Sequence, residues 1–117
     1  MTTAVPSLPP LPLATFHILL ALVDQELHGY AILQEVERRT AGDLRLSAGT
    51  LYRSIQRMLE AGWIEETRDR PAPEDDDERR RYYRITTAGR QVARAEARRL
   101  SHLVDLAAAS GLTPRRA

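Results

Sequence analysis

One segment, residues 28–66, limits the possible folds more than any other part of the chain. Apolar residues recur at helical spacing from about Tyr30 to Arg39. A second amphipathic helix is expected between Ser47, a good N-cap, and Gly62, a helix stop. Residues 63–67 then read as a strand. The order helix, turn, helix, strand predicts a helix-turn-helix domain.

The second of these helices has two contrasting faces. Its apolar residues fall within an arc of about 100° and predict a stripe that faces the core. That stripe consists of Leu51, Ile55, Met58 and Leu59. The opposite side carries small groups, hydroxyls and arginines, and because the major groove of B-DNA admits one α-helix, we expect it to contact phosphates and base edges. The candidate DNA-binding residues are Ser47, Gly49, Thr50, Tyr52, Arg53 and Arg57. The alternative is an ordinary solvated helix face.

The start of the first helix supplies further candidates. Gly29 permits a close approach or an unusual backbone angle. Tyr30 is expected to begin the buried stripe of this helix, and it is also counted among the DNA-binding candidates. His28 can meet a phosphate, although a structural helix cap is the simpler interpretation.

A β-hairpin, or wing, is expected after the helix-turn-helix. Its strands are residues 63–67 and about 80–86, joined by a charged, Pro-containing loop. Arg79, Arg80, Arg81 and Arg84 lie on or beside the second strand and are expected to hold the phosphate backbone or to enter the minor groove. DNA would repel the acidic run from Glu74 to Glu78, which is best interpreted as a solvated loop; its role stays open.

The rest of the chain divides into flanking segments. Residues 1–11 form a Pro-rich N-terminal arm and residues 12–86 a winged helix-turn-helix domain that opens with a helix from Pro12 to about Gln25. Thr86 is expected to cap a long helix over residues 87–109, and residues 110–117 form a flexible tail.

The last helix is the expected dimer element. An apolar stripe runs along it, and Glu96 and Arg99 interrupt this stripe at i,i+3 spacing. Charges on such a face are awkward in a monomer, whereas across a two-fold axis they can pair and fix the register. The expected interface residues are Leu13, Phe16, Val92, Glu96, Arg99, Leu100, Leu103, Leu106 and Ala107. A homodimer is therefore predicted.

Composition excludes several other classes of protein. The chain has 117 residues, 43% of them apolar, and it has no cysteine, so disulfides and thiolate chemistry are excluded. No apolar stretch is long enough to span a membrane and no secretory signal is evident, so a cytoplasmic location is expected. No cofactor, metal site or catalytic residue is predicted, and the chain is not expected to be an enzyme. His102 and Asp105 share a helix face but are interpreted as a solvated polar pair.

Several motifs together resemble the PadR family of bacterial transcriptional regulators, in its short form with a single helix after the wing. They are HGYAI at residues 28–32, SAGTLY at 47–52, LEAGWI at 59–64 and RRYYRIT at 80–86, followed by Ala88 and Gly89. The resemblance covers about residues 12–105. It implies a homodimer that represses transcription at a pseudo-palindromic operator, with Tyr52 and its neighbours in the groove. Ala48 departs from the pattern, since many members carry proline there.

The expected fold is mainly α with a small β-hairpin, a winged helix-turn-helix plus a long C-terminal dimerisation helix. The expected function is sequence-specific binding of double-stranded DNA by a homodimeric repressor. Two alternatives stay open. The net charge of +1 and the acidic loop are compatible with a winged helix that binds another protein. The same scaffold can also serve as a switch that responds to a small-molecule effector of unknown identity.

Overall fold

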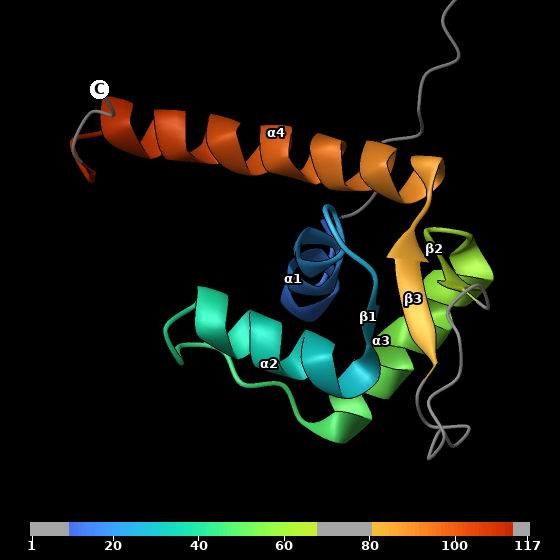
Figure 1. Cartoon of the computed structure of the whole chain (residues 1–117). Coiled ribbons are helices and arrows are strands. Elements are labelled where there is room, and N and C mark those ends of the chain that lie inside the picture. Colours follow the sequence, from blue (N-terminus) through green and yellow to red (C-terminus); the bar gives the residue numbers. More distant parts are fainter. Residues whose placement is uncertain (1–9, 68–80, 114–117) are drawn as a thin grey trace, which may run out of the picture.

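The computed structural model describes residues 10–67 and 81–113 as four helices and three short strands (Figure 1). In chain order they are α1 (Leu13–Ala21), β1 (Leu27–His28), α2 (Gly29–Arg39), α3 (Ala48–Ala61), β2 (Ile64–Thr67), β3 (Tyr82–Ile85) and α4 (Thr87–Ala109). The strands form an antiparallel sheet of order β1-β3-β2. In Figure 1, α4 crosses above α1 and its C-terminal half extends beyond it. The predicted mainly α, winged-helix class is confirmed.

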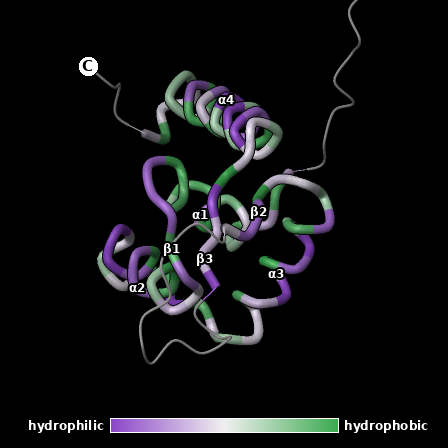
Figure 2. The backbone as a smooth tube through the Cα atoms, turned by 45° about the vertical axis from the view of Figure 1, so that its right-hand side comes forward, coloured by the Kyte–Doolittle hydropathy of each residue, from purple (hydrophilic) through white to green (hydrophobic). Residues whose placement is uncertain are grey.

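The core lies between α1, α2, α3 and the sheet. The largest fully buried side chains are Ile18, Leu19, Leu22, Ile32, Val36, Leu51, Met58 and Ile64. The stripe predicted for α3 is correct, because Leu51, Ile55 and Met58 are buried and Leu59 packs against them half-buried. Figure 2 shows hydrophobic and hydrophilic residues interspersed along α2, α3 and α4, as amphipathic helices require.

Local side-chain bonds fix the helix ends that the sequence predicted. The Ser47 hydroxyl accepts a hydrogen bond from the Thr50 backbone N–H at 3.1 Å, which caps α3. Gly62 ends this helix with a φ of 79°, a left-handed conformation that favours glycine. The Thr86 hydroxyl accepts from the Gly89 N–H at 3.0 Å and caps α4, whose bounds match the predicted residues 87–109.

The start of α4 is also fastened to the end of α3. The Thr86 N–H donates to the Trp63 carbonyl at 3.0 Å, and the Thr86 hydroxyl donates to the Gly62 carbonyl at 2.6 Å. Gly89 lies so close to this turn that a Cβ on it would stand 2.0 Å from the Trp63 carbonyl oxygen. We call this set of contacts the α3–α4 joint. It fixes the position of α4 relative to the helix-turn-helix.

Two expectations from the sequence were wrong. Helix α1 ends at Ala21 rather than near Gln25, because the chain turns there to form β1, which pairs with β3. Tyr30 is not buried: its exposed fraction is 63%. It lies two positions before Ile32, about 200° around a helix of 3.6 residues per turn, so with Ile32 facing the core Tyr30 must face outward.

Some predicted segments lie partly outside the described residues. The N-terminal arm, residues 1–11, is described from Pro10, where Leu11 packs half-buried against the core. The C-terminal tail is described as far as Thr113. The division of the chain into arm, domain, dimerisation helix and tail therefore stays a prediction.

Candidate nucleic-acid interface

The polar side of α3 lies at the surface as predicted. Ser47, Gly49, Arg53 and Arg57 are exposed, and Thr50 is half-buried. The hydroxyls of Ser47 and Thr50 are 3.0 Å apart and hydrogen-bonded, so the start of the helix is locally ordered. Small side chains at this end allow another molecule to come close to the backbone.

The two arginines of this face are available for other partners. Within residues 10–67 and 81–113, neither Arg53 nor Arg57 forms an ion pair or a side-chain hydrogen bond. The nearby Glu60 carboxylate accepts instead from the Gln56 amide at 3.1 Å. Two guanidinium groups one turn apart can each donate bidentate hydrogen bonds to a phosphate or to a guanine edge.

The start of α2 adjoins this face. The Gly29 backbone packs directly against the Tyr52 ring, and Tyr52 is itself 47% exposed. Tyr30 follows with its ring in solvent. His28 caps α2, because its Nδ1 accepts from the Ala31 N–H at 3.2 Å, and its ring meets Tyr82 edge-on at 5.4 Å. The structural cap is confirmed, while contact of His28 with a phosphate stays a prediction.

Two of the predicted wing arginines, Arg81 and Arg84, lie within the described residues. Arg81 is exposed and lies 3.6 Å from the Glu66 carboxylate. Arg84 pairs with Glu65 at 2.6 Å across the β2–β3 ladder. Arg79, Arg80 and the acidic run from Glu74 to Glu78 lie outside the described residues. The base of the wing is thus a row of opposed charges, which weakens its attraction for phosphate.

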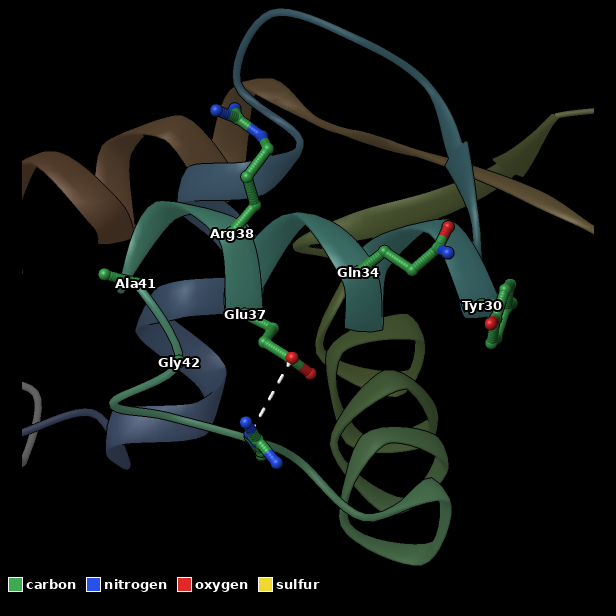
Figure 3. Close-up of a pocket in the computed structure, with 7 residues that line it drawn as sticks. Tyr30, Gln34, Glu37, Arg38, Ala41 and Gly42 are labelled. Carbon is green, nitrogen blue, oxygen red and sulfur yellow. Dashed lines mark ion pairs between the residues drawn. The ribbon is translucent and has the colours of Figure 1, made fainter.

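An open groove of about 590 Å³ lies between α2 and the loop that leads into α3 (Figure 3). It is lined by Tyr30, Gln34, Glu37, Arg38, Ala41, Gly42 and Arg45. Glu37 points toward Arg45 and pairs with it at 3.7 Å. Arg38 bonds to Glu35, and the bonds from Arg38 and Arg39 lower the pKa of Glu35 to about 2. Sequence reasoning did not find this groove, since it depends on how the loop folds back on α2.

The second half of α4 exposes apolar side chains. Leu103, Val104 and Leu106 are 39–52% exposed, and Leu13 at the start of α1 is 62% exposed. The other predicted apolar interface residues, Phe16, Val92, Leu100 and Ala107, are half-buried within the single chain. Leu103 and Leu106, three positions apart, lie on one side of α4, and exposed apolar patches in monomeric proteins often mark interaction sites.

Glu96 and Arg99 have a different environment from the one expected. Glu96 is buried, and it accepts from Arg99 at 2.9 and 2.7 Å and from the Leu11 backbone N–H. The charges on this stripe are therefore satisfied within one chain, so they need no partner across a two-fold axis. Their part in an interface stays a prediction.

The comparison with known proteins agrees with this geometry. The model of the PadR-like family of transcriptional regulators matches residues 18–95, more than half of the chain. The chain belongs to the PadR-like family. Transcriptional regulator Rv3488 of Mycobacterium tuberculosis is 38% identical over 87 residues, which are 74% of this chain and 75% of that protein. Uncharacterized protein X of Lysinibacillus sphaericus is 33% identical over 73 residues; the match covers 62% of this chain and 64% of that relative, just under two thirds.

Solved structures show the same PadR-like fold. A PadR family transcription regulator from Clostridium difficile matches with a TM-score of 0.69 at 20% identity, over 82% of this chain and 95% of that one. Bacillus subtilis PadR, solved in complex with operator DNA, matches with a TM-score of 0.60 at 19% identity, over 71% of this chain and 45% of that one. The PadR-like family consists of transcriptional regulators, not enzymes.

Two further observations concern the described part of this PadR-like chain. None of its described helices combines the length and the hydropathy that a membrane-spanning segment needs. Its described residues contain no group of three or more His, Asp or Glu side chains able to hold a metal ion. His102 and Asp105 are both exposed on α4.

The buried Glu96 predicts a pH-dependent stability. Hydrogen bonds from Arg99, and to a smaller extent from Leu11, lower its pKa below the ordinary 4.5 against the opposite effect of burial. A carboxyl group whose pKa is lower in the folded state stabilises the fold above its unfolded pKa, and this contribution is lost as the pH falls through the folded pKa. We expect Glu96→Gln to lower the free energy of unfolding by about 1 kcal/mol at pH 7.

Urea unfolding of the two proteins at several pH values measures this effect. The difference between wild type and Glu96→Gln should shrink steadily below about pH 4.5, where the carboxyl begins to protonate in the unfolded chain, and it is lost as the pH falls through the lower pKa of the folded state. Asp105→Asn, at an exposed position of α4, serves as the control and should leave stability unchanged at each of these pH values. A difference for Glu96→Gln that is constant with pH would contradict the stabilising role of the carboxylate.

Proposed function

We propose that this PadR-like protein is a sequence-specific DNA-binding repressor that acts as a homodimer on a pseudo-palindromic operator. The observation that carries the proposal is the pair Arg53 and Arg57, which project from α3 without ion-pair partners among the described residues. Arginine on a structural helix surface commonly pairs with a nearby carboxylate, as Arg38 and Arg39 do with Glu35. Binding of operator DNA by the relative from Bacillus subtilis supports the proposal.

In the proposed complex α3 lies in the major groove. Ser47 and Gly49 let the start of the helix approach the base edges, and Thr50 lies beside them. Arg53 and Arg57 then donate to guanine edges or to phosphates. Tyr52 packs on a thymine methyl group or donates to a phosphate. In this arrangement the contacts to base edges give sequence recognition, and the contacts to the DNA phosphates position the protein on the duplex.

Contacts outside α3 hold the protein on the duplex. His28 and Tyr30 at the start of α2 meet the phosphates that flank the groove, since this end of α2 adjoins Tyr52. Arg79, Arg80 and Arg81 follow the neighbouring backbone from the wing. These contacts contribute affinity with little sequence preference. A role on chromosomal DNA implies a cytoplasmic location.

The second copy covers the apolar surface of α4. The interface consists of Leu13, Phe16, Val92, Leu100, Leu103, Leu106 and Ala107, with Glu96 and Arg99 beside it. Burying the exposed leucines contributes about 25 cal/mol per Å² of apolar area removed from water. A two-fold axis there presents two α3 helices to the two halves of a palindrome.

Selection of bound fragments from sheared genomic DNA, followed by fluorescence anisotropy, tests the proposal. A selected fragment should bind much more tightly than a shuffled sequence of the same composition. Its affinity should fall about 10³-fold or more between 50 and 200 mM salt if each dimer contacts six or more phosphates. Failure to select any fragment at low salt would contradict DNA binding and favour the protein-binding alternative.

A further inference from the structure

Gly29 and Tyr52 are in unusually close contact, although they are 23 residues apart in the chain. A Cβ on Gly29 would lie 2.5 Å from the Tyr52 hydroxyl oxygen, 2.9 Å from its Cζ and 3.1 Å from its Cε1. Real Cβ atoms essentially never approach another heavy atom within 3.0 Å. The Tyr52 ring therefore occupies the space that any other side chain at position 29 would need.

The backbone gives no other reason for a glycine at this position. The described glycines with positive φ are Gly42, Gly62 and Gly111, and Gly29 is not among them. Gly29 is the first residue of α2, directly after the cap formed by His28, and L-residues adopt helical backbone angles there readily. Glycine within a helix also costs stability relative to alanine. Glycine is therefore needed at position 29 because a side chain there would overlap the Tyr52 ring.

Tyr83 is a second tyrosine whose ionisation is coupled electrostatically to that of Tyr52. It belongs to β3, the central strand of the sheet, and its side chain is buried. Burial raises the pKa of Tyr83, and the negative charges of Glu66 and of the ionised Tyr52 raise it further. Tyr52 thus packs against the start of α2, while its exposed fraction is 47%.

We propose that Gly29 is a positioning residue, whose missing side chain seats the Tyr52 ring in the orientation that meets DNA. The proposal rests on the proposed function for its consequence. A tyrosine side chain that is already held in place loses little conformational entropy when the protein binds DNA. A freely rotating ring would have to be ordered in the complex, and this entropic cost would weaken binding. We call the contact between Gly29 and the Tyr52 ring the seat. It joins α2 to the recognition surface of α3, so that the two helices present one rigid face.

A double-mutant cycle on DNA binding tests this consequence. Gly29→Ala should weaken binding of the selected fragment about fivefold to tenfold, because the new methyl group displaces the ring from its place. Tyr52→Ala should weaken it by at least as much. In the Tyr52→Ala background, Gly29→Ala should have no further effect, because the clash is gone. Equal losses in both backgrounds would overturn the proposal and leave Gly29 with a structural role only.

A spectroscopic measurement examines the seat without DNA. The chain has four tyrosines, so incorporation of 3-fluorotyrosine gives few ¹⁹F signals, and the signal of Tyr52 is assigned as the one that Tyr52→Phe removes. Gly29→Ala should shift or broaden that signal, with smaller changes at the exposed Tyr30. An unchanged Tyr52 signal would overturn the seat itself. If the wild-type protein does not bind DNA at all, the proposed function is refuted, and with it the role of the seat in recognition.

Discussion

Replacing both Arg53 and Arg57 by alanine is expected to lower the affinity for operator DNA about 100-fold or more. Each arginine contact with a base or phosphate contributes about 1–3 kcal/mol, and a dimer makes each contact twice. Stability should change by less than about 0.5 kcal/mol, because both side chains are exposed and unpaired among the described residues. Anisotropy titrations and urea unfolding of the same preparations measure the two quantities.

Arg94 and Arg98 provide a matched control for this experiment. They are also exposed and one turn apart, and they have no ion-pair partner within the described part of the chain, but they lie on α4. The Arg94→Ala, Arg98→Ala variant therefore changes the net charge equally and should lose much less affinity. Equal losses in the two double variants would mean that only net charge matters, and α3 would not be the recognition helix.

The single variants then distinguish a phosphate contact from recognition of a base. If Arg53→Ala weakens binding of operator and mutated operators alike, Arg53 binds a phosphate, and the slope of affinity against salt falls by about one for each phosphate that is no longer neutralised. If the weakening is confined to operators with one particular base pair, Arg53 reads that base. The same comparison applies to Arg57.

Gly89→Ala is expected to have the largest effect on stability, about 3 kcal/mol, enough to prevent folding in a marginally stable domain. The new Cβ would lie 2.0 Å from the Trp63 carbonyl oxygen, 2.9 Å from its carbonyl carbon and 2.8 Å from Ile85 Cγ1. A backbone carbonyl that already accepts the Thr86 N–H is not free to move aside. The free energy of unfolding in urea gives the magnitude.

Gly49→Ala is the matched control, since it adds the same methyl group to another helix. Its Cβ would lie 3.3 Å from the flexible end of Arg53, which can turn away, and alanine gains up to about 1 kcal/mol of helix propensity over glycine. Gly49→Ala should be neutral or stabilising. Similar stabilities for the two variants would refute the tight packing of α4 on the turn.

Features held by neighbouring residues in the chain could be predicted from the sequence. Ser47 and Thr86 each accept an N–H from three residues ahead, and Gly62 meets the backbone requirement at its own position. Each is a local interaction with a clear residue preference, so the starts and ends of α3 and α4 followed directly. The exposed face of α3 followed for a similar reason, because helical periodicity alone separates it from the core.

Features made by distant segments were missed. The strand β1 is only two residues long, too short to show an alternating pattern, and it exists because β3 lies beside it. Glu96 looked like an interface charge because nothing in the sequence shows that Leu11 brings an N–H to it from the other end of the chain. The sequence suggested a close approach at Gly29, but only the packing of α2 on α3 identifies Tyr52 as the partner.

The α3–α4 joint has a consequence for the shape of the operator. In the proposed dimer the two α4 helices meet at the axis, and Thr86 holds each α3 at a fixed angle to its own α4. The separation of the two recognition helices is then a property of the protein. One extra base pair between the half-sites turns one of them by about 35° and moves it by about 3.4 Å. A rigid joint cannot follow that change, so the protein would measure the length of DNA between its half-sites as well as read their bases.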